Sequence, residues 1–172
     1  MGTWMLILTV EICIIIFVIW IAWSGIYGAP WVPTPKNRVR AMLKIAGVNS
    51  NDVLYDLGSG DGRIIVMAGK EFGARAIGIE LDPIRLMWSR FSIRRHGLGD
   101  KVRVIRANFF KVSVEDATVV TLYQGHEINK KIITKLSSEL KSGSRVVSYR
   151  FILSGWEPTM INEDESIYLY IV

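Results

Sequence analysis

The stretch Asp52-Val-Leu-Tyr-Asp-Leu-Gly-Ser-Gly-Asp-Gly-Arg63 decides the fold of this chain. Its apolar first half, Val53 to Leu57, predicts a short buried strand, and the glycines at positions 58, 60 and 62 predict a turn into a helix over 62–72. Glycines allow positive φ and let a ligand approach the backbone, while the start of a helix offers free N–H groups. The stretch therefore predicts a nucleotide-type cofactor site, or else a glycine-rich turn without a ligand.

The spacing of the glycines narrows the choice of ligand. A dinucleotide fingerprint needs Gly-x-Gly-x-x-Gly, but Asp61 and Arg63 occupy positions where its last glycine would fall. The spacing from Asp56 to Gly62 is instead Asp-x-Gly-x-Gly-x-Gly, which resembles motif I of class I S-adenosylmethionine (SAM) methyltransferases. The carboxylate of Asp56 also suits a ligand that carries an ammonium group, because it would repel a pyrophosphate.

Short apolar runs alternate with helical patterns after the glycine loop. We expect strands over 75–80, 102–107, 118–123 and 145–151, and helices over 83–96 and 127–140. Such βαβ alternation predicts an α/β fold with a parallel, doubly wound sheet and helices on both faces. Residues 158–172 break the rhythm and predict a closing β-hairpin. Five parallel strands plus a C-terminal hairpin match a Rossmann-like methyltransferase sheet better than a nicotinamide-binding one.

The N-terminal residues form a separate apolar segment. From Trp4 to Tyr27 the only charged residue is Glu11, and the run is long enough to cross a ~30 Å hydrocarbon core as a helix. A cleavable signal peptide would have a basic start and a shorter apolar stretch. A buried core helix is rarely apolar all round, and a helix lying on a membrane surface needs a polar face. We therefore expect one transmembrane anchor over 1–28, with Glu11 near the headgroups or in contact with a partner helix.

Four basic residues, Lys36, Arg38, Arg40 and Lys44, follow the anchor, and no acidic residue lies between the anchor and Asp52. By the positive-inside rule, the globular part lies in the cytosol or its organellar equivalent. We expect a proline-rich linker or lid and a helix within 29–50, and the ligand-binding domain over 51–172. The four basic residues after the anchor account for part of the net charge of +5. We therefore predict an acidic or membrane-bound partner before a nucleic acid.

Cysteine and histidine usage predicts neither a disulfide nor a metal site. Cys13 is the single cysteine and lies in the apolar segment, and His96 and His126 are isolated in the sequence.

Candidate site residues lie after the predicted strands, because ligands bind doubly wound sheets beyond the carboxyl ends of the strands. Glu80 ends the second strand, where a carboxylate can accept hydrogen bonds from both ribose hydroxyls. After the third strand, Asn108 can pair with an adenine edge, and Phe109 or Phe110 can form an apolar wall for the ring. Tyr123 and Gln124 follow the fourth strand and either orient an acceptor amine or are ordinary loop residues.

The whole pattern resembles one family, the membrane-anchored seven-strand protein-lysine methyltransferases. Its mitochondrial members modify the adenine nucleotide translocase and the ATP synthase c subunit, and it has prokaryotic relatives. The resemblance covers nearly the whole chain from Pro30. It rests on the segments Trp31-Val-Pro-Thr-Pro35, Tyr55-Asp-Leu-Gly-Ser-Gly-Asp-Gly-Arg-Ile64, Gly78-Ile-Glu-Leu-Asp-Pro83, Lys135-Leu-Ser-Ser-Glu-Leu-Lys141, Arg145-Val-Val-Ser148 and Gly155-Trp-Glu-Pro158. Many related enzymes carry Asp where this chain has Asn108, and no Asn-Pro-Pro-Tyr sequence of adenine- or glutamine-methylating enzymes follows the fourth strand.

The resemblance implies a single-pass membrane protein that methylates a protein lysine at or near the membrane with SAM as cofactor. Methylation of a small or lipid-soluble acceptor and a non-catalytic SAM-binding membrane protein remain alternatives. The resemblance also implies a set of residues that contact the cofactor: Thr34, Asp56, Gly58, Ser59, Gly60, Asp61, Gly62, Glu80, Leu81, Asn108 and Phe109. Tyr123 and Gln124 would position the acceptor, and Trp31, Thr34 and Trp156 would line its channel.

Overall fold

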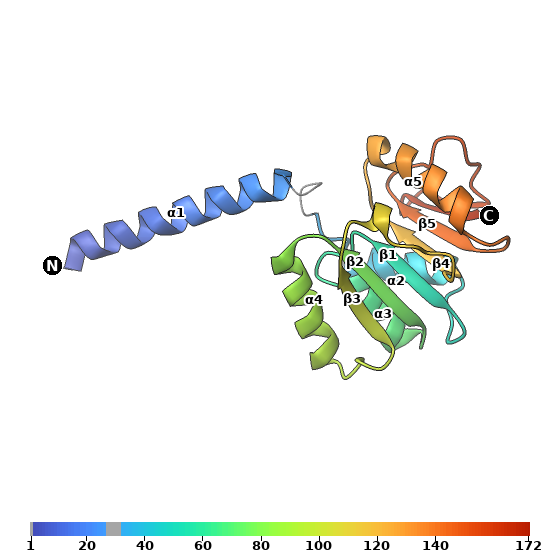
Figure 1. Ribbon diagram of the computed structural model, residues 1–172, viewed down its shortest axis with the longest axis horizontal. Coiled ribbons are helices and arrows are strands. Elements are labelled where there is room, and N and C mark those ends of the chain that lie inside the picture. The colour runs from blue at the N-terminus through green and yellow to red at the C-terminus, as the bar shows by residue number, and fades with distance from the viewer. Residues whose placement is uncertain (1, 27–31) are drawn as a thin grey trace. The chain divides into compact units, whose positions relative to one another are not determined.

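The computed structural model describes residues 2–26 and 32–172, and for residues 20–26 it describes the backbone alone (Figure 1). The chain divides into two compact units, Met1–Val32 and Pro33–Val172. The second unit therefore includes the proline-containing segment from Pro33 and the helix that follows it.

The first unit consists of helix α1 (Gly2–Ile26). Its 25 residues correspond to about 37 Å of helix. The window Gly2–Ile19 has a mean hydropathy of 2.4, and none of it is buried inside the protein. By length and composition α1 can cross a membrane, and a signal sequence would satisfy the same criteria. Aromatic residues near the end of a span are expected at the membrane interface, and those of this segment, Trp20, Trp23 and Tyr27, lie outside the described side chains.

The second unit contains one seven-stranded sheet with the order β3-β2-β1-β4-β5-β7-β6. Its strands are β1 (Val53–Leu57), β2 (Arg75–Glu80), β3 (Val102–Arg106), β4 (Val119–Leu122), β5 (Arg145–Tyr149), β6 (Met160–Asn162) and β7 (Ile167–Ile171). Strands β1 to β5 are parallel, and β7 pairs antiparallel with both β5 and β6. The predicted doubly wound sheet with a C-terminal hairpin is confirmed.

Helices cover both faces of the sheet (Figure 1). They are α2 (Lys36–Ile45), α3 (Arg63–Glu71), α4 (Pro83–Arg95) and α5 (His126–Glu139), with a short 3-10 helix η1 (Phe109–Lys111). One core cluster contains buried residues of α2, α3 and α4, and the other contains those of α5. We call these two sides the α3 face and the α5 face. Residues alternate between them along β1, since Leu54 belongs to the α3 face and Val53 and Tyr55 to the α5 face.

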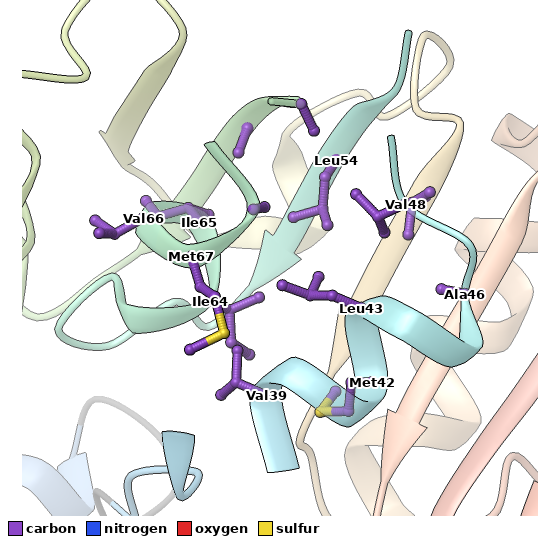
Figure 2. Packing of buried hydrophobic residues seen from close by; sticks show 14 of the residues in the cluster. Val39, Met42, Leu43, Ala46, Val48, Leu54, Ile64, Ile65, Val66 and Met67 are labelled. Carbon is purple, nitrogen blue, oxygen red and sulfur yellow. The ribbon is translucent and has the colours of Figure 1, made fainter. Parts of the chain in front are cut away.

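Helix α2 is held by its apolar side, as its helical spacing predicts. Val39, Met42 and Leu43 are fully buried. Figure 2 shows these side chains packing toward Ile64 and Met67 of α3 and toward β1. The segment that carries Thr34 is thereby attached to the same unit as the glycine loop.

The parallel register brings the carboxyl ends of five strands to one edge of the sheet. Leu57 of β1 is paired with Ile79 of β2 on one side and with Leu122 of β4 on the other. Glu80 is paired with Arg106 at the end of β3. Loops that leave these strands therefore meet at this edge, where the candidate site residues lie.

Candidate active site

The loop over residues 58–62 is fixed by backbone hydrogen bonds at the carboxyl ends of β1 and β2. The N–H groups of Gly58 and Ser59 donate to the carbonyl oxygen of Ile79 over 2.9 and 3.0 Å, and Gly62 N–H donates to the Ser59 carbonyl over 2.9 Å. All three glycines of the loop have positive φ. The side chain of Ser59 is buried and packs on Gly78 of β2. The contact is so close that a Cβ placed on Gly78 would lie 2.5 Å from Oγ of Ser59. The loop thus presents backbone, and not the Ser59 side chain, to its open side.

Glu80 is buried and holds the glycine loop. Its Oε2 accepts a 2.8 Å hydrogen bond from Gly60 N–H, and its Oε1 accepts one of 2.8 Å from Asp82 N–H. Each carboxylate oxygen has a second lone pair, so the group can still accept from a ligand. Asp82 in turn caps α4 by accepting from the N–H groups of Ile84 and Arg85. The sequence predicted Glu80 as a ligand contact, whereas its role in holding the loop is visible only in the structure.

Asp56 is a buried carboxylate with one unpaired oxygen. Its Oδ1 accepts a 2.7 Å hydrogen bond from the Thr121 hydroxyl, and its Oδ2 has no hydrogen-bond partner among the described residues. Burial raises the pKa of Asp56 to about 7; the Thr121 hydroxyl opposes this shift, and the charges of Glu80 and Asp61 add to it. A buried acceptor without a donor is costly, and an ammonium group would satisfy it. The residue therefore fits a cationic ligand group.

Gln124 joins the end of β4 to the glycine loop. Its Nε2 donates a 2.9 Å hydrogen bond to the carbonyl oxygen of Leu57, and the residue is 9% exposed. A Cβ on Gly58 would lie only 2.3 Å from this nitrogen, so the two residues are in close contact. Gln124 therefore positions the loop, and its predicted contact with an acceptor stays a prediction.

Aromatic side chains gather at the ends of β4 and β5. The ring of Tyr123 lies 4.8 Å from that of Tyr149 and 6.0 Å from that of Phe151, and His126 lies 5.2 Å from Phe151. We call these four residues the aromatic group. Arg150 adjoins it, with Nη1 3.5 Å from the Tyr123 hydroxyl and its guanidinium 5.6 Å from the centre of the Tyr149 ring. Of this group only Tyr123 was predicted from the sequence as a site residue, although Tyr149 and Phe151 also lie at the end of a strand.

Arg63 connects the glycine loop to the segment before α2. Its guanidinium pairs with the carboxylate of Asp61, with Nη2 2.6 Å from Oδ2, and its Nη1 donates a 2.8 Å hydrogen bond to the Thr34 carbonyl. Thr34 is buried. The charge of Asp61 is therefore compensated within the protein. Trp31, predicted to line the acceptor channel, lies outside the described residues.

The remaining predicted residues follow the ends of β2 and β3. The amide oxygen of Asn108 accepts a 3.0 Å hydrogen bond from Phe110 N–H and so caps η1. Phe109 packs against the core of the α5 face, and its ring lies 4.5 Å from that of Phe110. Leu81 is half-buried directly after Glu80.

Trp156 packs against a different core cluster from Tyr123 of the aromatic group. It packs against Tyr170, at a ring distance of 6.0 Å, on the α5 face. Tyr123 packs against the α3 face. The structure therefore brings Asp56, Glu80 and the glycine loop together with Gln124, whereas Trp156 and Tyr123 belong to different clusters. Within the described residues, no group of three or more His, Cys, Asp or Glu side chains could hold a metal ion.

Five parallel strands followed by an antiparallel hairpin, with a glycine loop after β1, define a class I methyltransferase fold. The crystal structure of an RNA methyltransferase from Salinibacter ruber in complex with S-adenosyl-L-homocysteine has this fold. It is 40% identical to this chain, covers 82% of this chain and 94% of its own, and superposes with a TM-score of 0.79. Residues 56–160 match the family model of the ANTKMT methyltransferase domain, and the chain belongs to this family.

Two similar proteins of this kind are lysine N-methyltransferases. A protein-lysine N-methyltransferase of Saccharolobus islandicus is 40% identical over 150 residues, which is 83% of this chain and 93% of the relative. A lysine N-methyltransferase of Xenopus laevis, named for the ATP synthase c subunit, is 33% identical over 77% of this chain. That alignment spans only 58% of the Xenopus protein.

Proposed function

We propose that this protein is a SAM-dependent protein-lysine N-methyltransferase that acts at a membrane. The single observation that carries the proposal is its 40% identity, over 93% of the relative's length, to the protein-lysine N-methyltransferase of Saccharolobus islandicus. The complex of the Salinibacter ruber relative with S-adenosyl-L-homocysteine supports SAM as the cofactor.

The residues at the sheet edge fit the parts of SAM. Asp56, with its unpaired Oδ2, would bind the ammonium group, and the backbone of Gly58 and Gly60 would contact the methionine end. Glu80 would accept from the ribose hydroxyls through the lone pairs that Gly60 and Asp82 leave free. Adenine would lie between Asn108 and Phe109. The other predicted contacts are Thr34, Ser59, Asp61, Gly62 and Leu81. Among them, the side chains of Ser59 and Asp61 would shape the glycine loop and would not touch the cofactor.

The aromatic group would receive the acceptor lysine. SAM supplies a methyl group already activated on a sulfonium sulfur. The chain has to hold a neutral amine at roughly 3–3.5 Å from that carbon and to exclude water. Tyr123, Tyr149 and Phe151 provide apolar walls, and the guanidinium of Arg150 beside them lowers the pKa of an entering amine. Desolvation and this charge favour loss of the lysine proton without a dedicated general base.

Replacing Glu80 tests the ribose assignment. In Glu80→Ala we expect the affinity for SAM to fall roughly 100-fold, because the variant loses acceptors for two hydroxyls and for Gly60 N–H. Isothermal titration calorimetry measures this change. Glu71→Ala is the matched control, since this carboxylate lies at the end of α3 and pairs with Arg40, away from the glycine loop. Wild-type SAM affinity in Glu80→Ala would rule out the ribose role.

Helix α1 supports a membrane location for the enzyme, with its globular unit in the cytosol. Four basic residues follow the helix, and two of them are paired in the folded unit: Arg38 with Glu165 and Arg40 with Glu71. Lys36 and Lys44 are exposed. A protein substrate within the same membrane would then be close to the site, and membrane lipid would contact the N-terminal helix.

One labelling experiment separates the candidate acceptors. The full chain is incubated with tritiated SAM and an extract containing membranes and RNA, and the label is followed into protein, lipid and RNA; Asp56→Asn serves as the inactive control. We expect a labelled protein band whose label maps to lysine by mass spectrometry. RNA is the second candidate, because the Salinibacter ruber relative is named an RNA methyltransferase. Label in RNA or lipid, or SAM binding without transfer, would contradict the proposal.

A further inference from the structure

Helix α4 has apolar residues on two opposite sides. Its inner side packs on β2 and β3 through Leu86, Ser89 and Ile93. On its outer side four large apolar residues are exposed: Ile84 (42%), Met87 (61%), Trp88 (58%) and Phe91 (64%). At about 100° per residue, these four lie within an arc of roughly 100° centred opposite the buried side. We call them the outer α4 stripe.

Such a stripe is unusual on a helix at the surface of a sheet. A surface helix normally carries polar residues on the side away from the core. Contiguous exposed apolar residues mark sites where another surface binds. The stripe therefore indicates an interaction surface, and it lies at the edge of the sheet where β3 is the last strand (Figure 1).

All charged residues of α4 are basic. Arg90, Arg94 and Arg95 are exposed, and α4 contains no acidic residue. Arg106 on the neighbouring strand β3, which alternates to the same face as Val102 and Val104, is exposed as well. A partner of this surface must therefore accept both apolar side chains and guanidinium groups.

We propose that the outer α4 stripe docks into the interface of an anionic lipid bilayer, with Arg90, Arg94 and Arg95 on the lipid phosphates. Helices that lie in membrane interfaces combine bulky apolar and aromatic side chains with Arg or Lys in this way. A nucleic acid would pair with the arginines but would leave Ile84 and Met87 without an apolar partner. A second copy packed stripe to stripe would bring the arginines of two α4 helices together, which like-charge repulsion disfavours.

Docking through α4 would also orient the enzyme. The helix begins directly after Asp82, two residues from Glu80 at the carboxyl edge of the sheet. A bilayer that binds α4 would therefore lie near the candidate active site. This contact is distinct from the proposed span α1, because it is made by the globular unit itself.

Spin labelling of the full chain tests the contact. In a Cys13→Ser background, Met87→Cys places a nitroxide in the stripe, and Thr134→Cys places one on an exposed position of α5 on the other face of the sheet. The labelled proteins are reconstituted into vesicles of phosphatidylcholine with phosphatidylglycerol, and collisions with oxygen and with an aqueous nickel chelate are measured. We expect position 87 to lose most of its accessibility to nickel and to gain accessibility to oxygen, while position 134 stays accessible to nickel.

Additional variants and conditions distinguish the partners. Phe91→Gln should restore nickel access at position 87, whereas the matched change Ile171→Gln, at an exposed position on β7 near the other edge of the sheet, should not. Equal nickel access at 87 and 134 in anionic vesicles would overturn the proposal. So would shielding that requires RNA, or shielding that disappears on dilution of the protein at constant lipid. Vesicle flotation reports insertion of α1 separately, and methyl transfer is assayed independently, so failure of this contact would leave the proposed function standing.

Discussion

Asp56→Asn is expected to weaken SAM binding roughly 150- to 4,000-fold, because a buried ammonium group left without its counter-charge costs about 3–5 kcal/mol. The same change should stabilise the ligand-free protein. Asp56 is buried, only one of its oxygens is paired with Thr121, and its pKa is raised to about 7. Removing a charge that the fold does not satisfy should gain about 1–4 kcal/mol at pH 8.

The pH dependence of both effects follows from the direction of this pKa shift. The folded protein keeps the Asp56 proton up to about pH 7, while the unfolded chain releases it near pH 3.8. The stability of the ligand-free wild type therefore falls as pH rises from about 4 to about 7. The advantage of Asp56→Asn should be full above pH 7 and absent near pH 4. Conversely, wild-type SAM affinity should fall as pH drops below 7, since protonated Asp56 cannot pair with an ammonium.

Asp52→Asn is the matched control for this prediction. Asp52 is also buried and lies just before the amino end of the same strand, but its carboxylate is fully engaged by Arg145, the Thr118 hydroxyl and Asn49 N–H. The control should destabilise the protein by about 1–3 kcal/mol and leave SAM affinity unchanged. Thermal denaturation between pH 5 and 8 and calorimetric titration measure the two variants. A loss of stability in Asp56→Asn at pH 8 would contradict our account of Asp56.

Gly58→Ala is the second change with a large expected effect, a loss of SAM affinity of about tenfold or more. Gly58 has a φ of +90°, which costs an alanine about 1–2 kcal/mol. Its new Cβ would lie 2.3 Å from Nε2 of Gln124. Gln124 cannot yield freely, because it is buried and bonded to the Leu57 carbonyl. The loop that would hold the methionine end of SAM must therefore move.

Gly143→Ala separates the backbone strain from the steric contact. Gly143 has a φ of +86°, and nothing lies within 4 Å of a Cβ placed on it. Both variants should lose similar stability from the backbone, but only Gly58→Ala should lose SAM affinity. Adding Gln124→Ala to Gly58→Ala should recover part of the affinity if the contact is the cause. Equal SAM affinity in the Gly58 and Gly143 variants, measured by calorimetry, would show that the Gly58–Gln124 contact does not matter.

The fold was predictable because the local patterns agree with one another. Each predicted helix and strand is present, with ends within about three residues of the prediction, since glycine loops, capping residues and apolar periodicity act over a few positions. Asp82 followed by Pro83 marks the start of α4 in the sequence as well as in the structure. The C-terminal hairpin was equally visible, from two apolar runs around the polar turn between β6 and β7.

The site was predictable only in part. The glycine spacing selected Asp56, and position at a strand end selected Glu80 and Tyr123, because these rules need only local sequence and the strand boundaries. The rule says nothing of partners, so it missed Arg63, which contacts the Thr34 carbonyl across 29 positions of sequence. The predicted contact of Gln124 with an acceptor stays a prediction, and only the structure shows that the Gln124 amide donates to the Leu57 carbonyl.

By itself, the sequence determined the order of helices and strands, the glycine loop and the acidic residues at the ends of β1 and β2, because these depend on near neighbours in the chain. Only the tertiary structure decided which polar groups are satisfied and which apolar side chains are exposed. Thr121 reaches Asp56 across 65 positions, and the pairing exists only because β4 lies beside β1 in one register. The exposed stripe on α4 is likewise undecided in sequence, since both of its sides are apolar and only the packing on β2 and β3 selects the one that is buried.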